Sequence, residues 1–288
     1  MICFVILHYM VAEETEGCVR ALDKLNGEKS IVIVDNASPN GSGKTIKELY
    51  KNRDDITVII NTENTGFAKG NNVGCKVAKE KYNPDFYVVM NNDVEITQIN
   101  FISRIEEAYK REHFDVLGPD IYSTTGQVHQ SPKSLKRTTI ESSHKLLEIY
   151  EKKRRSKIVV PIRCFLKRFK FLKKTVKKNS NKVLGIDYKK KYYDVPLHGS
   201  CFVFSRKFIE GRIEAFFEGT FFYYESEILD YECNIGGMKV VYDPTIEVLH
   251  HQNISTNTVY KNELKKVRFM NEQNYRSILA FLNKYEKG

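Results

Sequence analysis

The unbroken apolar run at residues 86–90 constrains the fold of this chain more than any other segment. A Pro84-Asp85 turn signal precedes it, and polar residues follow it at once. A short apolar run with such boundaries indicates a strand buried on both faces, as in a parallel sheet covered by helices. The polar residues that follow are Asn91, Asn92 and Asp93. They suit either an Asx-rich turn or a ligand site beyond the carboxyl end of the strand.

Three further apolar runs alternate with segments of helical periodicity. Residues 2–7, 31–34 and 56–60 predict strands, and helices are expected over residues 12–25 and 44–50 and through Ala78. This alternation implies βαβ units, and therefore a parallel sheet with right-handed crossovers. Asp35, Asn61 and Asn91 each follow a predicted strand, so we expect all three at one edge of the sheet. Shorter strands are predicted at residues 116–121, 201–204, 240–242 and 246–249.

The length and composition fit a folded domain. The chain has 288 residues, of which 41% are hydrophobic, enough for one large domain with or without an appendage. No stretch approaches the roughly 18 consecutive apolar residues of a membrane span, and residues 2–7 are too short for a signal peptide. We therefore expect a cytoplasmic protein. The six cysteines lack a C-x-x-C pair, which argues against a disulfide framework or a zinc site.

The positive charge is concentrated in one segment. The whole chain carries +10, whereas residues 133–182 hold 18 Lys and Arg against three Glu, so the remainder is mildly acidic. Within this segment, apolar residues recur at helical spacing between Ile162 and Val176, with basic residues between them. This basic amphipathic helix is either a packed surface helix, an interfacial helix on an anionic membrane, or a nucleic-acid patch. No nucleic-acid module is visible, so we expect no nucleic-acid partner.

The loops after the first strands fit a nucleotide better than a dehydrogenase or P-loop cofactor site. Neither G-x-G-x-x-G nor G-x-x-x-x-G-K-[ST] is present. A carboxylate such as Asp35 at a strand end can accept hydrogen bonds from a base or ribose. Gly66 and Gly70, at the start of the next predicted helix, would let the backbone approach a pyrophosphate.

Two carboxylates follow an aromatic-rich run at residues 216–224. Glu225 and Glu227 stand at the start of a predicted helix, where acidic residues are also favoured as ordinary caps. Aromatic surroundings disfavour the charged form of a carboxylate, which makes it a better general base.

The order of four segments resembles the inverting family 2 glycosyltransferases of GT-A fold, especially the bacterial branch that builds rhamnose-containing and other surface polysaccharides, such as capsule or O-antigen. The segments are residues 31–38, 64–74, 89–95 and 198–256. The resemblance implies an α/β fold with a Rossmann-like, mostly parallel sheet flanked by helices and a basic helical insertion. We predict a nucleotide-sugar-binding half (1–132), the insertion (133–190), an acceptor-side half (191–256) and C-terminal helices that pack or form oligomers (257–288).

The resemblance also implies roles for individual residues. Asp93 occupies the last position of the family's D-x-D motif and would hold Mn²⁺ or Mg²⁺ together with His250, although Asn91 replaces the first acid. The expected nucleotide contacts are His8, Tyr9, Asp35, Asn36, Asn64, Gly66, Lys69, Asn71, Asn91 and Asn92. The expected acceptor-side turn is His198, Gly199 and Ser200. The family's base position falls on Ser226, so Glu227 or Glu225 would have to replace it, with a slight preference for Glu227.

The function expected from this resemblance is transfer of a sugar, with inversion, from a UDP- or dTDP-sugar to a hydroxyl of a glycan or lipid-linked acceptor. A nucleotidyltransferase would share the doubly wound sheet, but His8-Tyr9-Met10 does not supply its Gly-rich basic loop. The alternative from another class is an inactive relative that acts as a membrane-associated assembly partner, which Asn91 and Ser226 would fit. Attachment to the inner membrane face through the insertion is compatible with either function.

Overall fold

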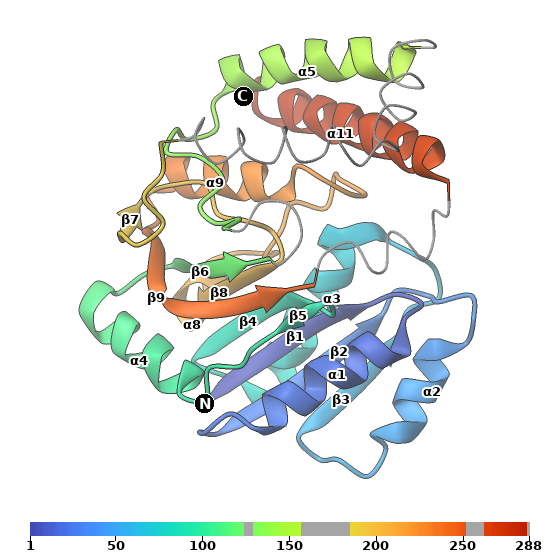
Figure 1. Cartoon of the computed structure of the whole chain (residues 1–288), viewed down its shortest axis with the longest axis vertical. Helices are drawn as coiled ribbons and strands as arrows, with labels where there is room; N and C mark the ends of the chain where they lie inside the picture. The colour runs from blue at the N-terminus through green and yellow to red at the C-terminus, as the bar shows by residue number, and fades with distance from the viewer. Residues whose placement is uncertain (124–128, 157–184, 252–261, 287–288) are drawn as a thin grey trace, which may run out of the picture.

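The computed structural model describes residues 1–123, 129–156, 185–251 and 262–286 (Figure 1). The predicted amphipathic helix between Ile162 and Val176 lies outside these residues, and so does the segment that follows His251. Membrane attachment through that helix therefore stays a prediction. Within the described ranges, no helix combines the length and the apolar character that crossing a membrane requires.

The first half of the chain forms the parallel part of the sheet. Strands β1 (Ile2–His8), β2 (Lys29–Asp35), β3 (Ile56–Ile60) and β4 (Phe86–Asn91) lie in the order β3-β2-β1-β4. Helices α1 (Ala12–Asp23), α2 (Ser42–Leu49) and α3 (Gly66–Tyr82) connect them. His8 lies opposite Asp35, and Leu7 lies opposite Asn91. The predicted alignment of these strand ends at one edge is confirmed.

The second half adds strands of mixed direction. Strand β8 (Cys201–Ser205) lies between β4 and β6 (Val116–Tyr122) and is antiparallel to both. Strand β9 (Val240–His250) pairs in parallel with β6, and the short strands β5 (Val94–Glu95) and β7 (Tyr192–Tyr193) pair antiparallel with β9. The sheet is therefore parallel in its first half and mixed in its second.

Strand β9 is one continuous strand, whereas the sequence predicts two short strands in its place. Residues 240–250 form one strand, but its register against β6 shifts between Pro119 and Asp120, whose partners are Asp243 and Glu247. Pro244 lies in this irregularity, where its missing N–H removes no regular ladder bond.

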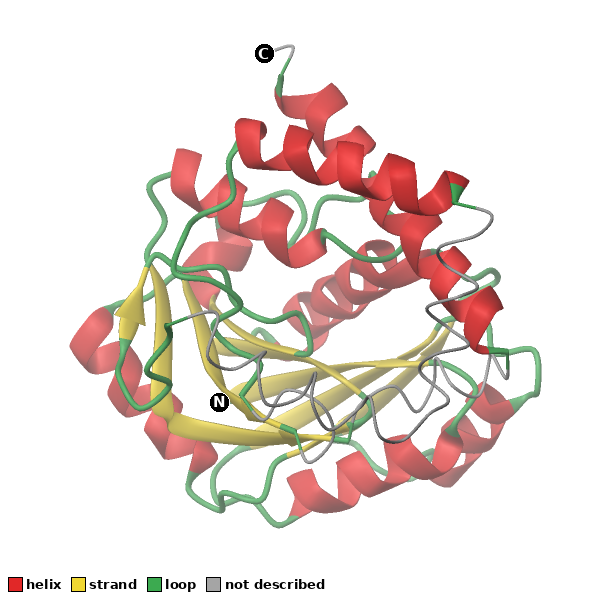
Figure 2. Cartoon of the chain, turned by 45° about the horizontal axis from the view of Figure 1, so that its top comes forward, coloured by secondary structure: helices red, strands yellow, loops and turns green. Residues whose placement is uncertain are grey.

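Helices cover both faces of the sheet (Figure 2). Helices α1, α2 and α4 (Phe101–Glu112) bury their apolar side chains against one face, together with Phe4 and Ile6 of β1. On the opposite face, Val5 of β1 packs in one core with side chains of α3, α8 (Arg206–Glu210) and α9 (Glu225–Ile235). The alternating β1 side chains thus enter two separate cores, as expected for a strand buried on both faces.

A third core joins α9 to two helices outside the sheet. Helices α5 (Ile140–Arg155) and α11 (Glu263–Tyr285) run side by side and meet α9 around Ile278 and Phe281 (Figure 1). Helix α5 belongs to the predicted basic insertion. The described part of the C-terminal segment is one helix rather than several, because neither Pro nor Gly interrupts residues 263–285.

Candidate functional site

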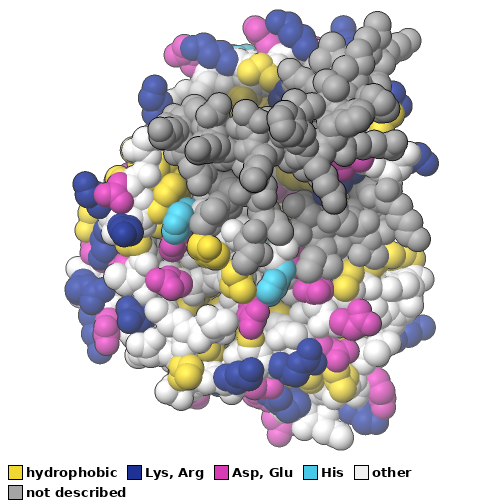
Figure 3. Space-filling view, in the orientation of Figure 1, with side chains coloured by type: hydrophobic (Ala, Val, Ile, Leu, Met, Phe, Trp, Pro, Cys, Tyr) yellow, Lys and Arg dark blue, Asp and Glu magenta, His cyan; other side chains and the backbone are white. Residues whose placement is uncertain are grey.

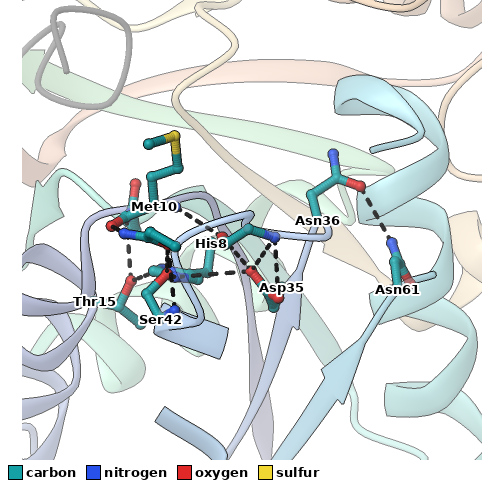
Figure 4. A network of polar contacts seen from close by, with 10 residues as sticks. His8, Met10, Thr15, Asp35, Asn36, Ser42 and Asn61 are labelled. Carbon is teal, nitrogen blue, oxygen red and sulfur yellow. Dashed lines mark hydrogen bonds and ion pairs between the residues drawn. The ribbon is translucent and has the colours of Figure 1, made fainter. Parts of the chain in front are cut away.

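A buried histidine organises the carboxyl end of β1 (Figure 4). The Nδ1 atom of His8 lies 2.8 Å from Thr15 Oγ1, and its Nε2 atom lies 2.8 Å from Ser42 Oγ. Burial lowers the pKa of His8 to about 4, although the Asp35 carboxylate acts in the opposite direction. The ring is neutral and has no exposed surface. His8 can therefore act on a bound nucleotide only indirectly, through the loops to which it is hydrogen-bonded.

Asp35 and Asn36 tie the neighbouring loops together. The backbone N–H of Ser38 donates to Asp35 Oδ1 at 3.2 Å, and the Ser38 hydroxyl also donates to this carboxylate. The Asn36 amide donates to Asn64 Oδ1 and to the Gly66 carbonyl, both at 3.0 Å. These bonds bring the predicted nucleotide residues Asp35, Asn36, Asn64 and Gly66 into one cluster.

The start of α3 contacts the aromatic-rich segment that precedes Glu225. Gly66 has a φ of +83°, and a Cβ atom there would lie 2.1 Å from the Phe221 carbonyl oxygen. The next backbone N–H, of Phe67, donates to that same oxygen at 2.8 Å. One turn further, the Asn72 amide donates to the Phe216 carbonyl at 2.7 Å and accepts from the Phe216 N–H. Sequence reasoning did not single out Asn72, whose only signal was its place in an Asn-Gly-rich stretch.

The remaining predicted nucleotide residues are spread along the same edge. Tyr9 is half-buried and Lys69 is exposed. Asn71 is buried and donates to the Phe67 carbonyl of its own helix. The Asn91 N–H donates to the Ser200 carbonyl, whereas Asn92 donates to Thr15 Oγ1 at 3.1 Å. Through Thr15, Asn92 connects the end of β4 with the His8 cluster.

Strand pairing brings Asp93 and His250 together. Asp93 directly precedes β5, and β5 pairs with β9 so that Val94 lies opposite His250. The His250 Nε2 atom lies 3.3 Å from Asp93 Oδ1. Both side chains are buried, and Asp93 Oδ1 has no hydrogen-bond partner among the described residues. On the other side of the ring, His250 Nδ1 lies 2.7 Å from Gln130 Oε1.

This pair fits a divalent cation that takes its other ligands from a substrate. Within the described part of the chain, no three His, Cys, Asp or Glu side chains gather as a protein-only metal site. Asp93 and His250 nevertheless offer one carboxylate and one imidazole, and the unpartnered Oδ1 atom lacks the compensation that a buried carboxylate needs. Mg²⁺ and Mn²⁺ are commonly held by few protein ligands, with phosphate oxygens and waters completing the shell.

Asp93 also lines a cavity of about 670 Å³ between α1 and β5. Four other acidic residues, one histidine and two basic residues also line this cavity: Glu13, Glu14, Asp23, Glu95, His251, Arg20 and Lys24. On the face shown in Figure 3, acidic side chains lie around a histidine near the centre of the view. An anionic ligand next to these carboxylates would be repelled unless a bound cation or a basic side chain lies between them.

The predicted acceptor-side turn lies next to the Asp93–His250 pair. The rings of His198 and His250 are 5.8 Å apart, and the Ser200 N–H donates to His198 Nδ1 at 3.2 Å. Burial, reinforced by the positive charge of Lys133, lowers the pKa of His198 to about 3. A Cβ atom on Gly199 would lie 4.0 Å from Ser226 Cβ, so the turn also meets the start of α9.

The two candidate bases have different environments. Glu225 is 8% exposed, and burial raises its pKa to about 7, although the Thr220 hydroxyl donates to it at 3.1 Å. Both Glu227 oxygens are engaged, one by the Lys133 ammonium and the other by the Ser226 hydroxyl. Burial acts to raise the pKa of Glu227, but Lys133 and Ser226 hold it below its usual value.

Two residues next to the site escaped the sequence analysis. Gln130 contacts His250, and Lys133 contacts both Ser226 and Glu227. In the sequence, Lys133 is only the first residue of the basic insertion, and Gln130 belongs to no pattern. Both contacts join residues more than 90 positions apart, which periodicity and local motifs do not report.

A protein-family model and a curated relative both match this chain. A family model described as "Glycosyl transferase family 2" matches residues 3–178, more than half of the chain. A curated relative, the low-salt glycan biosynthesis hexosyltransferase Agl10 of Haloferax volcanii, is 25% identical over 129 residues. That alignment covers 44% of this chain and 39% of the relative, so the chain matches well under half of the relative's length.

Three solved structures share the fold at low sequence identity. TarS residues 1–349 of S. aureus gives a TM-score of 0.55 at 11% identity, covering 99% of this chain and 72% of that 1–349 chain. The mannosyltransferase PcManGT of Pyrobaculum calidifontis, in complex with GDP-Man and Mn²⁺, gives 0.51 at 11% identity, with 100% and 75% covered. GalNAc-T7, with UDP, GalNAc and Mn²⁺, gives 0.57 at 13% identity, with 87% and 43% covered.

These likenesses confirm the expected α/β fold of GT-A type, with a mixed sheet flanked by helices. The rhamnosyltransferase-like branch remains a prediction. By the match that spans most of its first 178 residues, the chain belongs to glycosyl transferase family 2.

Proposed function

We propose that this protein transfers a sugar, with inversion, from a UDP- or dTDP-sugar to a hydroxyl of a surface glycan or lipid-linked acceptor. The observation that carries the proposal is the unpartnered Asp93 Oδ1 atom beside His250, at the same sheet edge as the nucleotide-side loops. The Haloferax relative is named a glycan biosynthesis hexosyltransferase. TarS was solved with UDP and with UDP-GlcNAc, which supports a nucleoside diphosphate sugar as donor.

Asp93 and His250 would hold Mn²⁺ or Mg²⁺ at this position. When bound, such a cation supplies Lewis-acid stabilisation of the departing diphosphate. Lys69 is exposed at the first turn of α3 and would place a further positive charge near the phosphates. Asn64 and the backbone after Gly66 would line the donor, while His8, Asp35 and Asn36 hold those loops in place.

Inversion needs one base that takes the proton of the attacking hydroxyl. We assign this role to Glu225, with Glu227 as the alternative that the sequence slightly favoured. A base works best when its pKa lies near the working pH, and burial brings Glu225 to about 7. Glu227 is instead neutralised by Lys133. His198 and Ser200, in the turn that meets the start of α9 at Gly199, would orient the acceptor.

Binding of nucleoside diphosphates to the purified protein tests the proposal. We would titrate UDP, dTDP and GDP by calorimetry, with Mn²⁺ and with EDTA, on the wild type, on Asp93→Ala and on the control Glu107→Ala, which lies exposed on α4. The expected result is Mn²⁺-dependent preference for one diphosphate, lost in Asp93→Ala and kept in Glu107→Ala. Equal binding by Asp93→Ala would remove Asp93 from the site, and no binding by the wild type would overturn the transferase proposal.

A further inference from the structure

Gln130 is a buried glutamine whose side chain faces a proposed metal ligand. It is 5% exposed, and its backbone N–H donates to the Ile121 carbonyl of β6 at 2.9 Å. Its side-chain Oε1 atom lies 2.7 Å from His250 Nδ1. The backbone bond fixes the glutamine to the strand next to β9, at whose end His250 lies.

The amide oxygen decides which nitrogen of His250 carries hydrogen. A neutral imidazole has one N–H, and an amide oxygen can only accept. With Oε1 facing Nδ1, the hydrogen resides on Nδ1 and donates to Gln130. The Nε2 atom then presents a lone pair to Asp93 Oδ1, 3.3 Å away. Two acceptors that face each other at this distance repel unless a cation or a proton lies between them.

We propose that Gln130 is a positioning residue that holds His250 in the Nδ1–H tautomer and so directs the Nε2 lone pair toward a divalent cation shared with Asp93. This inference rests on the proposed function, in which these two residues hold that cation. Metal-binding histidines commonly donate their other ring N–H to an oxygen acceptor, which fixes the tautomer and the ring orientation. The reversed amide, with its NH₂ group facing Nδ1, would place the hydrogen on Nε2 and abolish the lone pair.

The residues after Gln130 hold it from the other side. The Ser131 hydroxyl accepts from the His198 N–H at 3.4 Å, and the Lys133 N–H donates to the Pro196 carbonyl at 2.8 Å. Lys133 also pairs with Glu227. This segment therefore contacts the metal-ligand side and the catalytic-carboxylate side of the site at once, which keeps Gln130 in one place relative to both.

The tautomer can be observed directly without any metal. We would label histidine with ¹⁵N in wild type, Gln130→Met and Gln130→Glu, and record long-range ¹H–¹⁵N spectra in EDTA. His250 is assigned from the signals that disappear in His250→Asn. At a pH where the ring is neutral, we expect an Nδ1–H ring in the wild type, an Nδ1–H retained in Gln130→Glu, and a shift toward Nε2–H in Gln130→Met. An unchanged tautomer in Gln130→Met would overturn the inference.

Metal affinity supplies the second readout. Titration with Mn²⁺ in the presence of UDP, followed by electron paramagnetic resonance, should show affinity about 10- to 100-fold weaker for Gln130→Met, restored toward the wild type in Gln130→Glu. Gln98→Met is the matched control, because Gln98 bonds the β9 backbone at Thr245 rather than a histidine. Thermal unfolding in EDTA checks that each variant is folded.

The outcomes separate this inference from the proposed function. Wild-type Mn²⁺ affinity in Gln130→Met, with the wild type itself binding normally, would contradict the positioning role alone. Equal weakening by Gln98→Met would also contradict it, because the effect would then come from the backbone of β9. A wild type that binds neither Mn²⁺ nor UDP would overturn the proposed function, even if His250 keeps the Nδ1–H tautomer.

Discussion

Buried carboxylates in this protein differ in how well their charge is compensated. Asp243 and Glu227 each face a lysine, Lys191 and Lys133 respectively. The Glu225 carboxylate accepts hydrogen bonds only from a hydroxyl and from the backbone, and Asp93 Oδ1 accepts no hydrogen bond from the described residues. Poorly compensated charges cost folding free energy and cluster at functional sites. These two carboxylates are therefore where function and stability should oppose each other.

Replacing Glu225 should separate its roles in catalysis and in stability. If it is the base, Glu225→Gln should lower kcat by about 10²- to 10⁴-fold, and wild-type kcat/KM should fall as pH drops below about 7. Folding raises the pKa of Glu225. The stabilising contribution of its protonated form is therefore present below the pKa of the unfolded state and is lost as pH rises through about 7. Glu225→Gln should thus raise the free energy of unfolding by about 2 kcal/mol near pH 8 and change it little near pH 5.

The matched variant is Glu227→Gln, measured by the same pH–rate profiles and urea titrations. It should keep the acid limb near pH 7, because the group that titrates there is still present. If Glu227→Gln instead loses more activity than Glu225→Gln, and the acid limb survives in Glu225→Gln, the base is Glu227.

Replacing Asp93 should stabilise the metal-free protein. Asp93→Asn removes a buried charge whose Oδ1 atom is unpartnered, and the new amide can donate to His250 Nε2. We expect a gain of about 1 kcal/mol in the free energy of unfolding in EDTA, with loss of Mn²⁺-dependent nucleotide binding. Asp243→Asn is the control: its Oδ2 atom is also buried without a hydrogen-bond partner among the described residues, but the Lys191 ammonium lies 3.1 Å from it, so the substitution should destabilise. Destabilisation by both variants, measured in urea, would show that Asp93 is compensated in solution.

At the scale of elements, the contact between α3 and the aromatic-rich segment depends on Gly66. Its φ of +83° would strain any residue that has a side chain, and a Cβ atom at this position would lie only 2.1 Å from the Phe221 carbonyl oxygen. Gly41 has a similar φ of +78° but open space around it. Gly41→Ala should therefore lower the free energy of unfolding by only about 1 kcal/mol, which is the cost of the left-handed backbone conformation for a residue with a side chain.

We expect Gly66→Ala to cost at least about 2 kcal/mol more than Gly41→Ala, because the backbone must also move away from Phe221. It should also weaken nucleotide binding, since the same turn would line the donor. Urea titrations of both variants measure the two costs, and calorimetry measures nucleotide affinity. Equal costs would mean that the close approach relaxes without consequence.

The sequence predicted the parallel strands because each is a continuous apolar run with clear boundaries. It could not predict that β8 enters the sheet in the opposite direction, because strand order depends on pairing between residues far apart, such as Met90 and Cys201. The two-residue strand β5 is too short to give any periodic signal, yet it brings Asp93 to His250. That pair was expected from the family resemblance and not from spacing.

Within the site, the sequence identified residues by chemical type but not their partners. Asp35 and Asn36 are predicted to contact nucleotide, and their hydrogen bonds to the neighbouring loops follow from no sequence pattern. The Lys133 ammonium lowers the pKa of Glu227, but this pair forms only when the start of the insertion crosses the start of α9. Such contacts depend on the assembled fold rather than on local pattern.

Helix α11 packs against the segment that leads to Glu225. Phe281 is fully buried, with its ring 5.9 Å from Tyr224 and 4.9 Å from Tyr231. Tyr224 directly precedes Glu225, and its hydroxyl lies 2.7 Å from Ser143 Oγ of α5. The last helix of the chain and the helix of the predicted insertion thus meet at the residue before the proposed base.

Removing the Phe281 side chain should test this support. Phe281→Ala should lower the free energy of unfolding by about 3–5 kcal/mol, because it leaves a cavity in the core shared by α5, α9 and α11. Leu279→Ala, two positions away and 36% exposed, should change it by less than about 1 kcal/mol. If α11 positions Glu225, Phe281→Ala should also lose transferase activity at temperatures where circular dichroism still reports a folded protein. Full activity up to its unfolding temperature would show that α11 stabilises the fold without positioning the base.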